Sequence, residues 1–268
     1  RSHCWIQGRY RTQVDGSYRI VALPGRGVVG VNAILKVYPG GQGYETIEGV
    51  EDYDAFQKYG GVFAPLPKFP TAVKEVNPKI DGPAVECDFA LDSGCAVTLQ
   101  AVDPDGLPLA GVSVSGVSEI HSGSSPMETD TFDLIAFRQG ENRTVILHHK
   151  ERGLGKGLHI KPDQAGPAPI VVKLEPCATV FGQLVDANNE PVRGVYLRFD
   201  VSKDGNYGRQ LPRIATDDQG RFRRHDLPAG LPFNILAEGA TIPFVEVAKE
   251  LAAQPGQTVD LGTNDITS

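Results

Sequence analysis

Alternating apolar and polar positions mark a stretch that occurs twice along the chain. Val97, Leu99 and Ala101 alternate with polar residues, and the turn-forming residues of 103–106 follow them. This period of two predicts a half-buried strand, a tight turn and a second strand over residues 97–114. The same order of residue types returns over residues 179–197. We therefore expect an internal repeat of strand–turn–strand units.

The two turns correspond residue by residue, because 186 − 103, 191 − 108 and 194 − 111 all equal 83. Asn189 stands where the first copy has Gly106, and Asn tolerates the left-handed conformation nearly as well. A further turn, D-x-x-G-x-F at 217–222, is followed by Leu-Pro-x-G at 227–230. The residues that define these turns, called here the structural turn motif, are Asp103, Gly106, Pro108, Gly111, Asp186, Pro191, Gly194, Gly220 and Phe222.

The form D-x-x-G-x-P-x-x-G-V, followed by D-x-x-G-x-F and Leu-Pro-x-G, resembles the carboxypeptidase regulatory-like domain. That resemblance implies a transthyretin-like or prealbumin-like fold, similar to tandem copies in large bacterial multidomain proteins. The expected architecture is all-β, with tandem Ig-like antiparallel β-sandwiches of Greek-key topology. The first unit is expected to be incomplete and to carry an insertion.

Three units follow from the spacing of the motifs. Residues 1–92 are expected to be the C-terminal part of a first sandwich, with an insertion at about 38–70 and strand character at 85–91. Residues 93–176 and 177–268 are expected to be complete second and third units, and the third is expected to fold alone. The first segment would need its missing upstream strands to fold, because half a sandwich exposes the apolar inner face of its sheet to water.

The later halves of the two complete units also correspond, with a second constant offset in residue number. Phe132, Phe137 and Gly140 lie 90 residues before Phe222, Leu227 and Gly230. Residues 131–137 and 143–148 are predicted to form a hairpin around the turn at 139–142. In the last unit, strands are expected at 245–247 and 257–261.

Composition narrows the class of protein. Gly 31, Pro 20 and a charged fraction of 22% suit a turn-rich β-protein, and no apolar run approaches the ~20 residues of a membrane helix. The net charge of −7 without a clustered basic face argues against a nucleic-acid partner. The chain opens without Met, which suggests a piece of a longer protein. An extracytoplasmic location is favoured, with the compartment otherwise open.

The cysteines and the glycine-rich segment do not indicate a cofactor. Cys4, Cys87, Cys95 and Cys177 lack metal-ligand spacing and are expected to be small buried residues near strand ends. Residues 25–30 match G-x-G-x-x-G literally, but the alternation from 29 to 37 predicts a strand where a dinucleotide site needs a helix. No cofactor is therefore expected.

Two polar groupings were weighed as metal sites. His148, His149 and His159 with Glu151 form a concentration of histidines, but adjacent strand residues face opposite ways, so solvated or edge histidines are expected. The aspartates at 103/105, 186 and 217/218 could suggest calcium. They lie where strands must turn and lack a bidentate Glu at loop position twelve, so a structural role and no metal are expected.

These features predict a non-catalytic region that spaces, stabilises or docks other parts of a larger protein. Its partners would be other domains of the parent chain or a protein. The alternatives are carbohydrate binding by a starch-binding-like sandwich and an accessory region of a peptidase. The repeat also resembles collagen-adhesin B-type repeats, but Ala101 and Leu184 stand where those carry Lys, so no Lys–Asn isopeptide bond is expected.

The insertion concentrates aromatic residues. Tyr53, Phe56 and Tyr59 are the candidate binding surface, because loops on a rigid scaffold often carry binding. The competing interpretation is that these rings pack inward over an open end of the first sandwich. Both interpretations stay open from the sequence.

Overall fold

The computed structural model describes residues 10–33, 38–48, 70–118, 126–201, 210–239 and 244–266, and these are all-β. The chain forms two compact units, Arg1–Gly94 and Cys95–Ser268. We call residues 95–176 the middle repeat and 177–266 the last repeat, and the boundary between them stays a prediction. In the described part of the chain, no helix is long and apolar enough to cross a membrane.

The first unit contains one small sheet. Its elements are β1 (Gly27–Val31), the 3-10 helix η1 (Tyr44–Thr46) and β2 (Ala72–Val76), and β1 pairs antiparallel with β2. Ile47 and Val73 are buried against Val28 and Tyr44. Tyr44, an aromatic residue of the predicted insertion, therefore packs inward. The strand that begins at Gly27 occupies the G-x-G-x-x-G segment, where a dinucleotide site would need a helix.

The prediction of strand character at 85–91 is wrong, because no strand is formed there. The segment instead receives side-chain bonds. Tyr18 donates its hydroxyl hydrogen to the Cys87 carbonyl, and Lys74 Nζ donates to the Asp88 carbonyl at 2.7 Å. The alternation of residue types was real, but it lacks the backbone partner that a strand requires.

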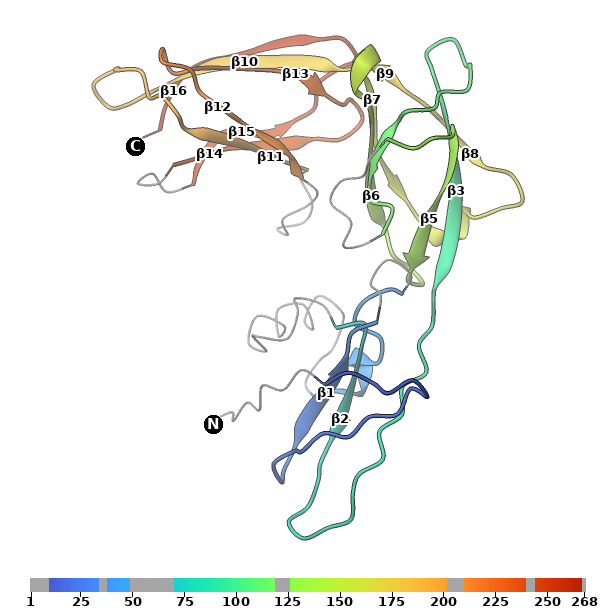
Figure 1. The fold of residues 1–268 in the computed structure, drawn as a ribbon. Coiled ribbons are helices and arrows are strands. Elements are labelled where there is room, and N and C mark those ends of the chain that lie inside the picture. Colours follow the sequence, from blue (N-terminus) through green and yellow to red (C-terminus); the bar gives the residue numbers. More distant parts are fainter. Residues whose placement is uncertain are drawn as a thin grey trace. The chain divides into compact units, whose positions relative to one another are not determined.

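The second unit holds the remaining strands, drawn from green to red in Figure 1. The elements of the middle repeat are β3 (Cys95–Val102), β4 (Ser113–Ser115), β5 (Thr131–Phe137), β6 (Arg143–His149), η2 (Lys150–Arg152), β7 (Leu154–Ile160), η3 (Pro162–Gln164), β8 (Ile170–Lys173) and β9 (Glu175–Pro176). Those of the last repeat are β10 (Ala178–Val185), β11 (Tyr196–Val201), β12 (Gln210–Ala215), β13 (Arg221–Leu227), β14 (Phe233–Glu238), β15 (Val245–Leu251) and β16 (Thr258–Asp265).

Each repeat is a sandwich of two sheets. The middle repeat pairs its strands as β5-β3-β8 and β4-β6-β7-β9, and the last repeat as β13-β10-β16 and β12-β11-β14-β15. Figure 1 shows the two layers of the last repeat. Val97, Leu99 and Ala101 point into the middle core, while Val180 and Leu184 point into the last. The period-two pattern thus identified the inward faces of β3 and β10 correctly.

Two expectations about strand pairing are corrected. β5 and β6 lie in different sheets, so residues 131–148 cross between layers and do not form a hairpin. Both faces of β6 are largely buried, and the sequence alone does not identify the partner of either strand. The sheets are also not wholly antiparallel, because β3 pairs parallel with β8 and β10 pairs parallel with β16. β8 and β16 each follow a strand of the opposite sheet and enter beside the first strand of their repeat in the same direction.

Candidate functional site

The aspartates of the structural turn motif shape three turns in the same way. The Asp103 carboxylate accepts hydrogen bonds from the backbone N–H groups two and four residues later, at 2.9 and 3.0 Å. Asp186 and Asp217 accept the same pair of bonds, each at 2.8 to 2.9 Å. The carboxylates therefore replace missing strand bonds inside the turns, as Asx turns do.

These bonds also set the titration of two of the carboxyl groups. The pKa of Asp103 lies below its usual value because Leu107 N–H donates to it, and Arg152 and Asp105 contribute further. The pKa of Asp217 is lowered chiefly by the Arg221 N–H. The carboxylate oxygens of Asp103 and Asp217 thus bond to backbone donors within their own turns. Among the described residues, no group of three His, Cys, Asp or Glu side chains is placed to hold a metal.

The remaining residues of the structural turn motif adopt the backbone conformations and bridges that the turns require. Gly106 has φ 84° and Asn189, at the matching position, has φ 64°, so Asn does adopt the left-handed conformation there. Pro108 and Pro191 each form an isolated bridge, to Val102 and Val185. The other glycines of the motif, Gly111, Gly194 and Gly220, also have positive φ.

Gly220 joins two turns of the last repeat. Its carbonyl accepts from Leu184 N–H at 2.8 Å, and a Cβ placed on it would lie 2.4 Å from the Leu184 oxygen. Two residues on, Phe222 is 3% exposed within the core. The D-x-x-G-x-F sequence therefore closes the core beside the Asp186 turn.

A contact between the two repeats uses the Leu-Pro-x-G sequence. The Gly157 N–H of β7 donates to the Ala229 carbonyl at 2.8 Å. Leu231 and Ala229 are buried, and Ile146 of β6 belongs to the hydrophobic core of the last repeat. We call this contact the junction.

Glycine makes the junction possible. A Cβ on Gly157 would lie 2.6 Å from Leu231 Cδ1, and one on Gly155 would lie 2.9 Å from Cys177 Sγ. Gly230 has φ 101°, and its Cβ would lie 2.3 Å from the Gly157 oxygen. Side chains at these positions would separate the repeats. Our sequence analysis missed Gly155 and Gly157, although two glycines inside a strand do signal a close backbone approach.

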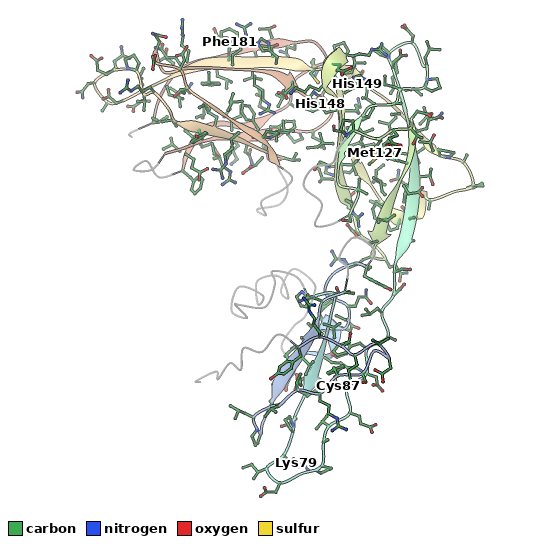
Figure 2. The ribbon with its side chains drawn as sticks, viewed as in Figure 1. Lys79, Cys87, Met127, His148, His149 and Phe181 are labelled. Carbon is green, nitrogen blue, oxygen red and sulfur yellow. The ribbon has the colours of Figure 1, made fainter. Side chains whose placement is uncertain are left out.

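The prediction of solvated or edge histidines is wrong for His148 and His149 (Figure 2). His149 is buried beside Gly111, and its Nδ1 accepts from Arg152 N–H at 3.3 Å. His148 is half-buried near Arg224 and Asp226 of the last repeat, and burial lowers its pKa. The two rings do face opposite ways, as strand geometry requires. One faces its own core, and the other faces the junction.

The cysteines differ from the buried set that we expected. Cys95 is exposed, and Cys87 and Cys177 are half-buried free thiols, while Cys4 lies outside the described residues. Burial at the junction raises the pKa of Cys177 to about 12. A thiol with that pKa stays protonated at neutral pH and is a poor nucleophile.

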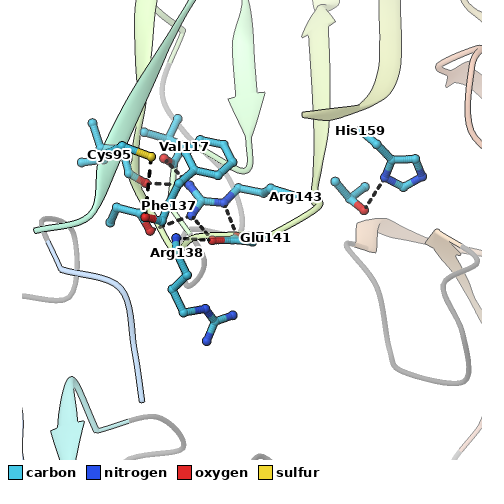
Figure 3. Close-up of polar contacts among 10 residues, drawn as sticks. Cys95, Val117, Phe137, Arg138, Glu141, Arg143 and His159 are labelled. Carbon is cyan, nitrogen blue, oxygen red and sulfur yellow. Dashed lines mark hydrogen bonds and ion pairs between the residues drawn. The ribbon is translucent and has the colours of Figure 1, made fainter. Parts of the chain in front are cut away.

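Arg143 is a buried charge that sequence reasoning did not identify (Figure 3). It is 3% exposed and donates to the carbonyls of Val117, Ile135 and Ala136 at 2.6 to 3.2 Å. Its ion pair with Glu141 measures 2.7 Å, and its guanidinium lies 3.8 Å from the centroid of the Phe137 ring. Arg143 therefore supplies hydrogen bonds to the irregular backbone around the crossing from β5 to β6.

The candidate binding surface of Tyr53, Phe56 and Tyr59 lies outside the described residues and remains a prediction.

Comparisons with known proteins find similar structures but no family. No family model matches the chain, and no curated protein matches it. A streptococcal ancillary pilin is 15% identical with a TM-score of 0.28, over 63% of this chain and 62% of that one. The Bacillus anthracis TIE protein is 12% identical with a TM-score of 0.29, over 72% and 35%.

A third similar structure is the dioxygenase domain of a dioxygenase and carbohydrate-binding protein fusion from Streptomyces sp. SirexAA-E. It is 16% identical with a TM-score of 0.24, over 33% of this chain and 79% of that domain. The chain thus spans less than two thirds of the ancillary pilin. TM-scores this low carry no inference about the activity or partners of the chain.

Proposed function

We propose that residues 95–266 form a non-catalytic spacer in which two carboxypeptidase regulatory-like sandwiches move as one body within a larger protein. The observation that carries this proposal is the junction. Its backbone bond from Gly157 to Ala229 and its closely fitting glycines favour one relative placement of the repeats. A flexible tether between independent sandwiches would need neither feature.

The proposal is tested by the tumbling of the intact chain. ¹⁵N relaxation should give one rotational correlation time for the amides of both repeats. Gly157→Val should give two, because its side chain would overlap Leu231. Gly166→Ala is the matched control, since a Cβ there meets nothing within 4 Å. Two separate correlation times in the unaltered protein would contradict the spacer.

A steric double variant makes the test sharper. Leu231→Ala removes the side chain that a Cβ on Gly157 would overlap. If the junction holds the repeats together, adding Leu231→Ala to Gly157→Ala should restore part of the shared tumbling. Failure of this rescue, with both single variants folded, would indicate that the contact does not set the placement.

A further inference from the structure

The outer face of the sheet β12-β11-β14-β15 differs from the corresponding face of the middle repeat. In the middle repeat, Ile146 and His148 of β6 lie opposite Gly157 and Gly155, and this glycine-lined face receives the last repeat. Ninety residues later, Leu236 and Glu238 take their places on β14. Leu236 pairs with Glu246, and Ala237 pairs with Val245, which sets Phe244 beside Glu238.

Large side chains therefore stand where the junction needs glycine. Phe244 and Glu246 occupy the positions of Gly155 and Gly157, so this face has no room for a Leu-Pro-x-G turn like that of the last repeat. A further repeat docked in the same way is excluded as its occupant.

Two exposed rings flank the face. Tyr196 is 51% exposed on β11 opposite Glu238, and Phe244 is 56% exposed on the other side of Glu238. Because neighbouring strands lie about 4.8 Å apart, the backbone positions that carry the two rings are separated by about 10 Å across β14. Arg213 and Glu238 form an ion pair of 3.0 Å, and the Arg213 side chain is half exposed.

A buried ion pair holds part of this face in place. Arg198 and Asp200 point to the same side of β11 as Tyr196, bond to each other, and are 6% and 4% exposed. The Arg198 guanidinium lies 5.0 Å from the centroid of the Phe244 ring. One oxygen of Asp200, Oδ1, is buried without a hydrogen-bond partner. Burying a charged pair is costly, so its presence beneath an exposed ring suggests that the ring is positioned for use.

The chemistry of the face selects the class of ligand. Arg213 and Arg198 are balanced by Glu238 and Asp200, and the exposed Glu246 adds one negative charge, so most of the charged groups on this face are paired. Sugar rings present apolar C–H faces to aromatic side chains and hydroxyl groups that both donate and accept. Exposed rings that flank paired charges match this alternation, whereas a protein hot spot is expected to have a dry centre.

We propose that this outer face binds a neutral oligosaccharide. Tyr196 and Phe244 stack on two sugar rings, and Arg213 and Glu238 bond the hydroxyl groups between them. The proposal is independent of the spacer function, because the residues of the junction are not those of this outer face.

The test uses the intact chain and four linear hexasaccharides, of α-1,4-glucose, β-1,4-glucose, β-1,4-xylose and β-1,4-mannose. Amide chemical shifts are followed by NMR during each titration. At least one sugar should shift resonances of Tyr196, Glu238 and the residues beside Phe244. Tyr196→Ala and Phe244→Ala should each weaken binding by about tenfold or more, equivalent to about 1.4 kcal/mol. Both side chains are exposed, so the fold should survive these changes.

Tyr10→Ala is the matched control, since Tyr10 is 53% exposed in the first unit and should not alter affinity. Glu238→Gln should weaken binding while leaving the rings in place. The proposal is overturned if none of the four sugars shifts these resonances at millimolar concentration. It is also overturned if binding survives Tyr196→Ala and Phe244→Ala together, or if those variants change only self-association in sedimentation.

Discussion

The middle and last repeats have the same sandwich fold, but each buries an arginine at a different position in that fold. At positions 90 residues apart, the middle repeat has Leu134 and Arg143 where the last repeat has Arg224 and Phe233. All four side chains are at most 3% exposed. The arginine has thus changed places with an apolar residue between the copies.

The surroundings of the two arginines explain how each is tolerated. Arg143 bonds three backbone carbonyls and Glu141, whose side chain is 11% exposed. Arg224 donates to the Pro212 carbonyl at 2.6 Å and pairs with Asp226, whose side chain is 42% exposed. Each guanidinium also lies over a phenylalanine ring. Both repeats therefore keep the same sandwich core, while the position of the buried arginine follows the backbone carbonyls that need a hydrogen-bond donor in each repeat.

The largest effect is expected when Arg143 is removed. Arg143→Met should lower the unfolding free energy by about 3–5 kcal/mol, because Glu141 and the carbonyls around Ala136 lose their buried partner. Urea denaturation of the full chain measures this. Arg221→Met, at a side chain that is 64% exposed, is the control and should stay within about 0.5 kcal/mol. A loss for Arg143→Met no larger than the control's would refute this role of Arg143.

The second largest loss of stability is expected for Gly230→Ala, compared with Gly140→Ala at the matching turn of the middle repeat. Gly230→Ala should cost about 2–5 kcal/mol, of which about 1–2 comes from its left-handed φ and about 1–3 from overlap with the Gly157 oxygen. Gly140→Ala should cost only the first part, about 1–2 kcal/mol, because a Cβ there meets nothing within 4 Å. Equal losses in urea denaturation would show that the junction contributes nothing to stability.

Replacing the second arginine should cost less than replacing the first. Arg224→Leu gives the last repeat the residue of position 134 and should lose about 1–2 kcal/mol, chiefly from the unpaired Pro212 carbonyl. Asp226 can regain water, since its side chain is 42% exposed. Thermal denaturation of Arg224→Leu beside Arg143→Met measures the difference. A larger loss for Arg224→Leu would reverse our ranking of the two sites.

The smallest effect concerns pH at the junction. Burial holds the pKa of His148 below its usual value near 6.5, with Asp226 opposing the shift. As the pH falls through 6.5, the unfolded chain takes up the proton first, so the unfolding free energy declines until the folded-state pKa is passed. Arg224, Asp226, His149 and Lys150 are the charged or titratable groups that act on His148.

His148→Gln should therefore show a flatter dependence of stability on pH between 7 and 5 than the unaltered chain. Urea denaturation at a series of pH values, with ionic strength held constant, measures this. His225→Gln, which removes an exposed imidazole of β13, is measured alongside so that the effect of His148 itself is separated from a general effect of replacing a histidine. Identical slopes for His148→Gln and the unaltered chain would rule out a contribution from His148.

Short stretches of sequence predicted much of the fold, because the inward faces of strands and the turns depend on residues that are close together in the chain. The alternation around Leu99 follows from one wet and one dry face, and the turn aspartates bond to backbone groups within four residues. The left-handed Asn189 was also readable, since few residue types accept that conformation. The carboxypeptidase regulatory-like resemblance rests on these same positions.

Tertiary structure alone decided which strands pair and what covers each face. β5 and β6 are consecutive strands in different sheets, and period two cannot reveal this because either arrangement buries the same side chains. The sequence pattern predicts that His148 is exposed to solvent. In the folded chain it faces Asp226, which follows it by about 80 residues and belongs to the last repeat. The sequence by itself determined the turns and inward faces, because those depend on near neighbours. The junction, the buried Arg143 and the outer face of Tyr196 and Phe244 depend on distant backbone, so only the folded chain brings them together.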